Sequence, residues 1–181
     1  MSADHPAPVG LPRWNRVAGR FLRLFNPPAR RMISAGIPTG APNVLLTVRG
    51  RRSGKARTVP LGMLELDGAW FVQACYGETG WVANLRTAGE ATVTQPGGRR
   101  VPVQAIELSP EVAGPVLRRA LEPFRRSRVF RALLGRHARG PVAILWAFRI
   151  RIDDTLEEYT ETARRYPLFE LRPMTDATQP G

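Results

Sequence analysis

The sequence predicts an α+β fold, a small and mostly antiparallel β-barrel with helices flanking it. Several segments place apolar side chains at every second position, which is typical of half-buried strands, and short glycine-containing turns join most of them. Helical spacing is found near the two ends of the chain, in one short central segment and in one long insertion. A doubly wound parallel sheet would instead alternate strand and helix throughout.

The predicted strands are justified by their alternation and by the turns between them. The pair Asp67-Gly68 is a strong hairpin signal, because both central positions of a type I′ turn require positive φ, and Gly97-Gly98 gives a second hairpin turn. In chain order the predicted strands cover residues 44–49, 57–66, 69–75, 91–95, 99–108 and 142–152.

The predicted helices begin with residues 13–25, where apolar side chains recur at helical spacing with arginines between them. Asn26-Pro27 ends this helix, because a residue before proline avoids the α region. A helix over 109–134 starts with Ser109 as cap and is expected to break near Pro123. The remaining helices cover residues 29–35, 81–87 and 153–166, the last with acidic residues first and arginines last.

These elements divide the chain into four expected parts. Residues 1–12 are a disordered tail, 13–36 an amphipathic N-terminal helical segment, 37–170 the barrel domain and 171–181 a loose C-terminal tail. Two interpretations of residues 13–25 stay open. The helix packs against its own domain, or it lies on a membrane surface.

Composition excludes several classes of protein. The chain has 181 residues, 43% hydrophobic and 23% charged, as expected for one soluble domain. The single cysteine, Cys75, excludes an intrachain disulfide, and with only His5 and His137 a zinc site would need carboxylate ligands. No apolar run reaches the roughly 18 residues of a membrane span, and residues 1–12 lack the pattern of a secretory signal. A cytoplasmic protein is therefore expected.

The charge is unusual, with a net value of +12. Lys55 is the only lysine, so 26 of the 27 basic residues are arginines, a bias that a GC-rich genome also produces. A basic surface suits phosphates, nucleic acid or anionic lipid. One basic block lies in a glycine-rich turn rather than along a helix, and its members are Arg49, Arg51, Arg52, Lys55 and Arg57.

This turn is not a P-loop. Arg49 stands where a Walker A motif needs glycine, Ala56 stands where it needs serine or threonine, and a strand rather than a helix follows. Two interpretations stay open, an anion-binding loop of cations and backbone amides, or a solvated basic hairpin. The sequence contains no G-x-S-x-G and no G-x-G-x-x-G. Cys75 lacks a nearby histidine in the sequence and is expected to be a small buried apolar residue.

Four segments together resemble the deazaflavin-dependent nitroreductase family. They are Val44 to Gly54, Arg57 to Leu61, Asp67-Gly68, and Trp81 with Asn84-Leu85. This family consists of actinobacterial split β-barrel proteins related to FMN-binding pyridoxamine-phosphate oxidase-like barrels. The resemblance covers about residues 25–108. It implies an FMN-binding-like split β-barrel, coenzyme F-420 as cofactor, and hydride transfer to a quinone, nitroaromatic or other conjugated lipophilic acceptor.

The resemblance also implies the cofactor-binding residues, with no catalytic side chain assigned and no metal. Tyr76 stands where the family has a lysine, in a shorter loop, and Gly62 stands where it has a tyrosine. The ring pocket is therefore expected to be wider, or the cofactor to differ. The implied cofactor-binding residues are Arg51, Arg52, Ser53, Lys55, Arg57, Thr58, Val59, Pro60, Leu61, Cys75, Tyr76, Gly77 and Trp81.

Two alternatives remain beside the F-420-dependent enzyme. The first is the same barrel using FMN. The second is a non-catalytic barrel that holds a lipid or another apolar ligand and docks on a membrane through residues 13–25. Nucleic acid is not expected as a partner, because the basic residues do not fall into a recognisable binding module. A homodimer is a further expectation, because split barrels commonly bury a sheet face in this way.

Overall fold

The structure, a computed structural model, describes residues 30–36, 43–126 and 155–174. Residues 30–34 are helical. The strands are β1 (Val44–Arg49), β2 (Ala56–Leu61), β3 (Met63–Leu66), β4 (Ala69–Gln73), β5 (Glu90–Thr94), β6 (Arg100–Glu107) and β7 (Leu168–Pro173). The longer helices are α2 (Gly80–Ala88), α3 (Pro110–Arg126) and α6 (Leu156–Arg165).

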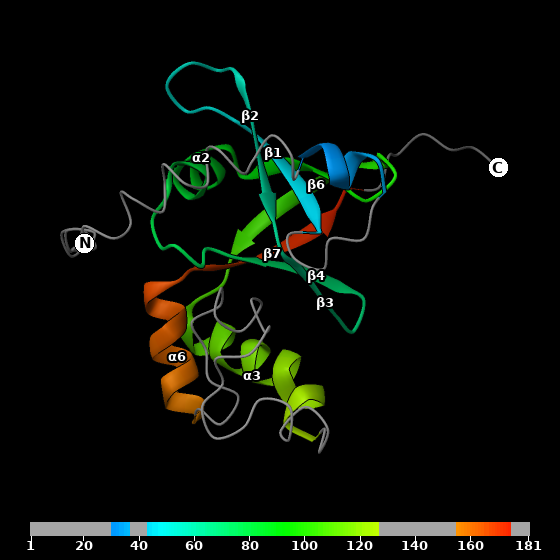
Figure 1. Ribbon diagram of the computed structural model, residues 1–181. Helices are drawn as coiled ribbons and strands as arrows, with labels where there is room; N and C mark the ends of the chain where they lie inside the picture. The colour runs from blue at the N-terminus through cyan, green and yellow to red at the C-terminus, as the bar shows by residue number, and fades with distance from the viewer. Residues whose placement is uncertain (1–29, 37–42, 127–154, 175–181) are drawn as a thin grey trace, which may run out of the picture.

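The seven strands form one sheet in the order β2-β1-β5-β6-β7-β4-β3. All six neighbouring pairs are antiparallel. Figure 1 shows the sheet curled, with α3 and α6 together on one side and α2 near the β1–β2 end. The predicted α+β class, a mostly antiparallel barrel with flanking helices, is confirmed.

The barrel curls at Gly62, where the predicted strand 57–66 proves to be two strands. β2 and β3 are consecutive in the chain yet lie at opposite edges of the sheet. Asn43 holds the bend: its backbone N–H donates to the Leu61 carbonyl at 3.0 Å. Its side chain donates to the Met63 carbonyl at 3.1 Å and accepts from the Met63 N–H at 2.7 Å. A glycine inside a strand pattern often marks such a bend.

The two predicted hairpin turns are confirmed by their backbone angles. Asp67 and Gly68, between β3 and β4, have φ of 53° and 79°. Gly97 and Gly98, between β5 and β6, have φ of 83° and 86°. Positive φ at both central positions is the signature of a type I′ turn, whose twist matches that of the strands it joins.

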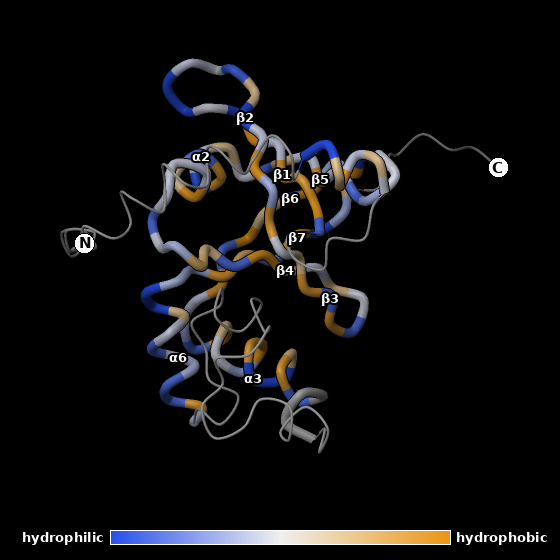
Figure 2. Tube along the Cα trace, in the orientation of Figure 1, coloured by the Kyte–Doolittle hydropathy of each residue, from blue (hydrophilic) through white to orange (hydrophobic). Residues whose placement is uncertain are grey.

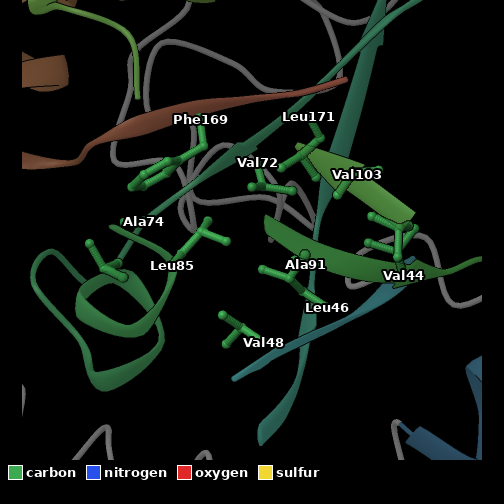
Figure 3. Packing of buried hydrophobic residues seen from close by; sticks show 12 residues of the cluster. Val44, Leu46, Val48, Val72, Ala74, Leu85, Ala91, Val103, Phe169 and Leu171 are labelled. Atoms are coloured by element: carbon green, nitrogen blue, oxygen red, sulfur yellow. The ribbon is translucent and has the colours of Figure 1, made fainter. Parts of the chain in front are cut away.

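Two hydrophobic clusters lie on the two faces of the sheet. Figure 3 shows the first, inside the barrel, where side chains of several strands and of α2 point toward one another. Its members are Val44, Leu46, Val48, Val72, Ala74, Val82, Leu85, Ala91, Val93, Val103, Phe169 and Leu171. The second lies between the sheet and the helix pair, and its members are Phe71, Ala113, Leu117, Leu121, Tyr159, Ala163 and Leu168. Burial of a large apolar side chain contributes about 1.5–3 kcal/mol.

Helices α3 and α6 pack closely through Gly114. A Cβ built on Gly114 would lie 2.5 Å from Thr160 Oγ1 and 3.0 Å from the Thr160 backbone nitrogen. The start of α6 is fixed by a capping box, in which the Thr155 hydroxyl accepts from the Glu158 N–H and the Glu158 carboxylate accepts from the Thr155 N–H. Acidic residues first and arginines last are confirmed for this helix.

Three sequence-based expectations are wrong. Leu171 and the two residues after it are not a loose tail, because Leu168–Pro173 is strand β7, between β6 and β4. The helix expected to break near Pro123 runs continuously as α3 to Arg126. Strand β4 ends at Gln73, because Cys75 lies in the following turn.

Other expectations lie outside the described residues. They concern the tail 1–12, the helix 13–25, the strand 142–152 and the end of the chain after residue 174. Among the residues that the structure describes, no helix is both long enough and apolar enough to cross a membrane.

Candidate functional site: a basic loop held by helix α2

The segment 50–55 joins β1 to β2 and is named the basic loop. The Gly50 N–H donates to the Lys55 carbonyl at 3.0 Å, and the Gly54 N–H donates to the Gly50 carbonyl at 2.8 Å. Gly54 has a φ of 64°, which favours glycine. Figures 1 and 2 show the loop beyond the end of the sheet as a hydrophilic projection. The backbone is therefore a closed turn, and the side chains of Arg51, Arg52 and Lys55 are exposed.

Gly50 is buried at the base of this loop because the chain closes tightly there. A Cβ at this position would lie 3.0 Å from the Lys55 carbonyl oxygen and 3.3 Å from Ser53 Oγ. A larger residue would therefore force the two ends of the loop apart. The glycine allows the Gly50–Lys55 hydrogen bond to form.

Helix α2 holds the first residue of the loop turn through one side chain. The Oδ1 atom of Asn84 accepts from the Arg51 backbone N–H at 3.2 Å and from Arg51 Nη1 at 3.0 Å. Asn84 is only 9% exposed. The cofactor-binding residues expected from the sequence did not include Asn84, because 33 positions separate it from Arg51 and no local pattern predicts the contact. Its place in the segment Trp81 to Leu85 of the family resemblance was the available signal.

Helix α2 is in turn fixed to the barrel. Val82 and Leu85 are buried in the barrel cluster. Arg86 donates from Nε to Glu107 Oε2 at 2.6 Å and from Nη2 to Glu107 Oε1 at 2.7 Å, and it also pairs with Glu78. These hydrogen bonds, chiefly the one to Glu107, raise the pKa of Arg86 above its ordinary value. The helix is therefore a rigid support for Asn84.

The cations at the loop have no acidic partner within residues 30–36, 43–126 and 155–174. No ion pair in these ranges involves any of them, whereas five other arginines pair with carboxylates, namely Arg86, Arg119, Arg164, Arg165 and Arg172. Their positive charge is therefore uncompensated by the described part of the protein. The cations are Arg49, Arg51, Arg52, Lys55 and Arg57.

Strand β2 continues the candidate site from the loop along the barrel wall. Its residues Thr58, Val59, Pro60 and Leu61 are all half-buried. Val59 and Leu61 pack against the barrel cluster. The Thr58 hydroxyl lies 2.9 Å from the Thr47 hydroxyl of β1. Since side chains alternate between faces, Thr58 and Pro60 lie on the outer face of the wall.

The segment before α2 holds three of the remaining expected site residues. Cys75 packs against the cluster beneath α3 and α6, and its thiol donates to the Gln73 carbonyl at 3.5 Å. Burial raises the pKa of the Cys75 thiol to about 12, so it stays protonated at neutral pH. Tyr76 is half-buried, and Gly77 is buried with a φ of 70°.

Trp81, the last expected site residue, lies at the start of α2 and is half-buried. Its ring packs against Phe169, with 6.0 Å between the ring centroids and 57° between the ring planes. The tryptophan therefore contributes to the barrel core at the end covered by α2. The packing of Trp81 on the barrel core is therefore observed, whereas its contact with a coenzyme remains a prediction from the sequence.

The donor set at the loop fits an anionic group. Guanidinium forks bind phosphate and carboxylate with two parallel hydrogen bonds, and lysine adds a compact charge. Within the described residues no cluster of His, Cys, Asp and Glu could hold a metal ion. Fold and site together define an antiparallel barrel with a loop of exposed cations.

Comparison with known proteins identifies the family of this chain. Residues 25–122 match the model of the family described as "F420H(2)-dependent quinone reductase". Because the match covers more than half of the 181 residues, the chain belongs to this family. It is an oxidoreductase of the class that depends on coenzyme F-420, and the resemblance, the enzyme class and the expected cofactor are confirmed. No curated protein matches the chain.

Several solved structures show weaker similarity. One, described as an F420-H2-dependent reductase, is 22% identical with a TM-score of 0.46 and covers 73% of this chain and 95% of its own. Another, described as a domain-swapped dimer, is 22% identical with a TM-score of 0.46, and the match covers 86% of this chain and 99% of that chain. An FMN-binding protein from Nostoc punctiforme is 14% identical with a TM-score of 0.41, and the match covers 91% of this chain and 82% of that chain.

Proposed function

We propose that this protein transfers a hydride from reduced coenzyme F-420 to a quinone, a nitroaromatic or another conjugated lipophilic compound. Family membership supports the coenzyme. The observation that supports the location of the site is the group of loop cations without an acidic partner among the described residues. The phosphate and the glutamate carboxylates of the coenzyme are the anions that such a loop suits.

The proposed roles follow the order of the elements. Arg51, Arg52 and Arg57 bind the phosphate or the tail carboxylates, with Ser53 and Lys55 beside them. The residues 58–61 of β2 line the edge of the ring, and Cys75, Tyr76, Gly77 and Trp81 are the further cofactor-binding residues. When bound, the coenzyme supplies the hydride, and the chain binds and orients it. No side chain is assigned a catalytic proton transfer.

Titration of the purified protein with two cofactors tests the cofactor assignment. Calorimetry with coenzyme F-420 and with FMN should show much tighter binding of F-420, because only it adds the tail carboxylates to the phosphate. Tighter binding of FMN would overturn the assignment in favour of a flavin-dependent barrel. Binding of neither, with retention of an apolar ligand, would favour a non-catalytic binding protein.

Rapid mixing tests the acceptor class separately. Oxidation of the reduced coenzyme is followed by its absorbance after mixing with a soluble menaquinone analogue or with a nitroaromatic compound. A rate that rises with either acceptor supports the proposal. A protein that binds the coenzyme but leaves it reduced with both acceptors would contradict the acceptor class while leaving the cofactor in place.

Two proposals about partners rest on the sequence. Residues 13–25 interleave four arginines with an apolar stripe, which favours contact with an anionic membrane surface. Removal of the segment before Asn26 should abolish sedimentation with anionic vesicles and leave the melting temperature unchanged. A large drop in melting temperature would instead make this helix part of the core.

A homodimer is the second proposal, and equilibrium sedimentation tests it directly.

A further inference from the structure

We propose that Asn84 is the positioning residue of the basic loop, and that its neutral side chain orients Arg51 while leaving the positive charge of Arg51 available to an anion. The proposal rests on the anion-binding role proposed for the loop and assigns the control of that role to helix α2. It concerns a residue whose observed contacts are with Arg51.

The first step is the geometry at one oxygen atom. Asn84 Oδ1 accepts both the backbone N–H and the Nη1 of the same residue, Arg51, at 3.2 Å and 3.0 Å. One acceptor therefore fixes the backbone where the loop turns and also the direction of the guanidinium. An arginine side chain carries about 2 kcal/mol of rotamer entropy, which is lost when the side chain is fixed. Because Asn84 already fixes Arg51 in the folded protein, this cost does not fall on the binding of a ligand.

The second step concerns the donors that remain. Among the described residues, the Arg51 guanidinium makes no side-chain hydrogen bond other than that from Nη1 to Asn84. Its Nε and Nη2 atoms form the other edge of the planar fork, which is the edge that binds a carboxylate or phosphate with two bonds. Arg51 is exposed, so this edge is accessible to a ligand.

The third step is the charge of the acceptor. Asn84 is 9% exposed and holds Arg51 with a neutral carbonyl oxygen. An aspartate at this position would have nearly the same shape and would hold Arg51 at least as firmly, since charge-assisted hydrogen bonds are stronger. It would also neutralise the guanidinium. The stability of the loop would then stay the same or rise, while the affinity of the loop for an anion would fall.

The fourth step is the rigidity of the support. Arg86, two residues after Asn84, is bound to Glu107 of β6 by two hydrogen bonds, and Leu85 is buried in the barrel. The position of Asn84 is therefore set by the barrel rather than by the loop. A loop that depended on its own flexible residues would need to be ordered by each ligand, at an entropic cost.

Four proteins test the proposal, namely the wild type, Asn84→Asp, Arg51→Lys and Asn43→Asp. Affinity for coenzyme F-420 and for inorganic tripolyphosphate is measured by titration, and the melting temperature of each protein is recorded. Asn84→Asp should bind both anions about tenfold or more weakly, the lower end of the range for hydrogen bonds to charged groups, with a melting temperature equal to or above that of the wild type. A merely structural asparagine would lower affinity and melting temperature together.

Asn43→Asp is the matched control, because it makes the same chemical change at the opposite end of β1, where Asn43 bonds Met63. Its anion affinity should stay near that of the wild type. Arg51→Lys keeps the charge but removes the fork that Asn84 holds, so it should also weaken anion binding. It provides a result even if Asn84→Asp fails to fold, and wild-type affinity in Arg51→Lys would overturn the proposal.

The two probes separate this proposal from the proposed function. If the wild type binds tripolyphosphate but not coenzyme F-420, and Asn84→Asp weakens that binding, the positioning role stands and the cofactor assignment fails. If the wild type binds the coenzyme and Asn84→Asp binds it equally well, the positioning role fails alone. If the wild type binds neither anion, both are overturned.

Discussion

Two groups of arginines in the described part of the protein have opposite electrostatic environments. Those at the basic loop have no carboxylate partner among the described residues. A second group, on helices α2, α3 and α6 and on strand β7, pairs with acidic side chains of the same chain. These paired arginines are Arg86, Arg119, Arg164, Arg165 and Arg172.

The difference shows that net charge alone does not locate the site. Paired arginines join elements to one another: Arg86 joins α2 to β6, Arg119 joins α3 to the β3–β4 turn, and Arg164 joins α6 to α3. Arg51 also joins two elements, but through a neutral amide, so it keeps its charge. Where the partner is neutral, an arginine can support the fold and still attract an anion.

The largest effect is expected from removing one loop cation. Arg52→Ala or Arg57→Ala should weaken binding of coenzyme F-420 by about 10- to 100-fold, the range for a hydrogen bond to a charged group. The melting temperature should stay unchanged, because both side chains are exposed. Arg119→Ala, which removes the same charge from a pair with Asp67, is the control and should bind normally. Equal affinities in all three variants would show that the loop is a solvated hairpin.

A stability effect without an affinity effect is expected in the helix pair. Gly114→Ala places a methyl group against the Thr160 backbone and should destabilise the fold by about 1–3 kcal/mol. Denaturant unfolding measures the change, and coenzyme affinity of the folded protein should be unaffected. Gly80→Ala, where a Cβ meets open space, is the matched control. An equal or more stable Gly114→Ala protein would show that α3 and α6 can move apart.

A smaller effect is expected at the support of α2. Glu107→Gln leaves the shape but removes the charge that Arg86 binds, and it should lower stability by about 1 kcal/mol or less, since the pair is partly exposed. Because α2 also positions Asn84, coenzyme binding should weaken slightly in parallel. Thermal unfolding and titration of the same sample measure both. A loss of stability without any change in affinity would separate α2 from the loop.

The smallest effect at neutral pH concerns Cys75. Its folded pKa of about 12 exceeds the ordinary value of 9.0, so the folded protein holds the thiol proton more tightly than the unfolded chain does. The stabilising contribution is therefore complete below pH 9 and decreases as the pH rises from 9 toward 12. Unfolding free energy measured across this range should fall more steeply for the wild type than for Cys75→Ala. Identical slopes would contradict the burial of the thiol.

Local signals predicted the parts of the fold that depend on neighbouring residues. Asp67-Gly68 and Gly97-Gly98 specify hairpins because positive φ is required within the turn itself. The helix predicted over 153–166 from its acidic start and its basic end is observed as α6 at Leu156–Arg165. The strand β1 was predicted with its observed ends, Val44 and Arg49.

Contacts between distant residues were not predictable in this way. Strand β7 has no turn signal of its own and pairs with β4, whose Trp70 lies opposite Leu171 although it comes far earlier in the chain. The hydrogen bonds from Arg51 to Asn84 likewise depend on how α2 packs on the barrel. Gly62 did carry a signal, but whether a strand glycine bends the chain depends on partners such as Asn43. Sequence therefore located the basic loop and missed the residue that orients it.

The position of β7 has a consequence for how the protein is made. Its residues begin only at Leu168, yet they lie between β6 and β4 and contribute Phe169 and Leu171 to one cluster and Leu168 to the other. While the ribosome is still synthesising the chain, the strands made earlier keep two unpaired edges, and such edges readily pair with other molecules. The barrel can close only after this segment leaves the exit tunnel, so the edges of β6 and β4 stay exposed until the last part of the fold has been made.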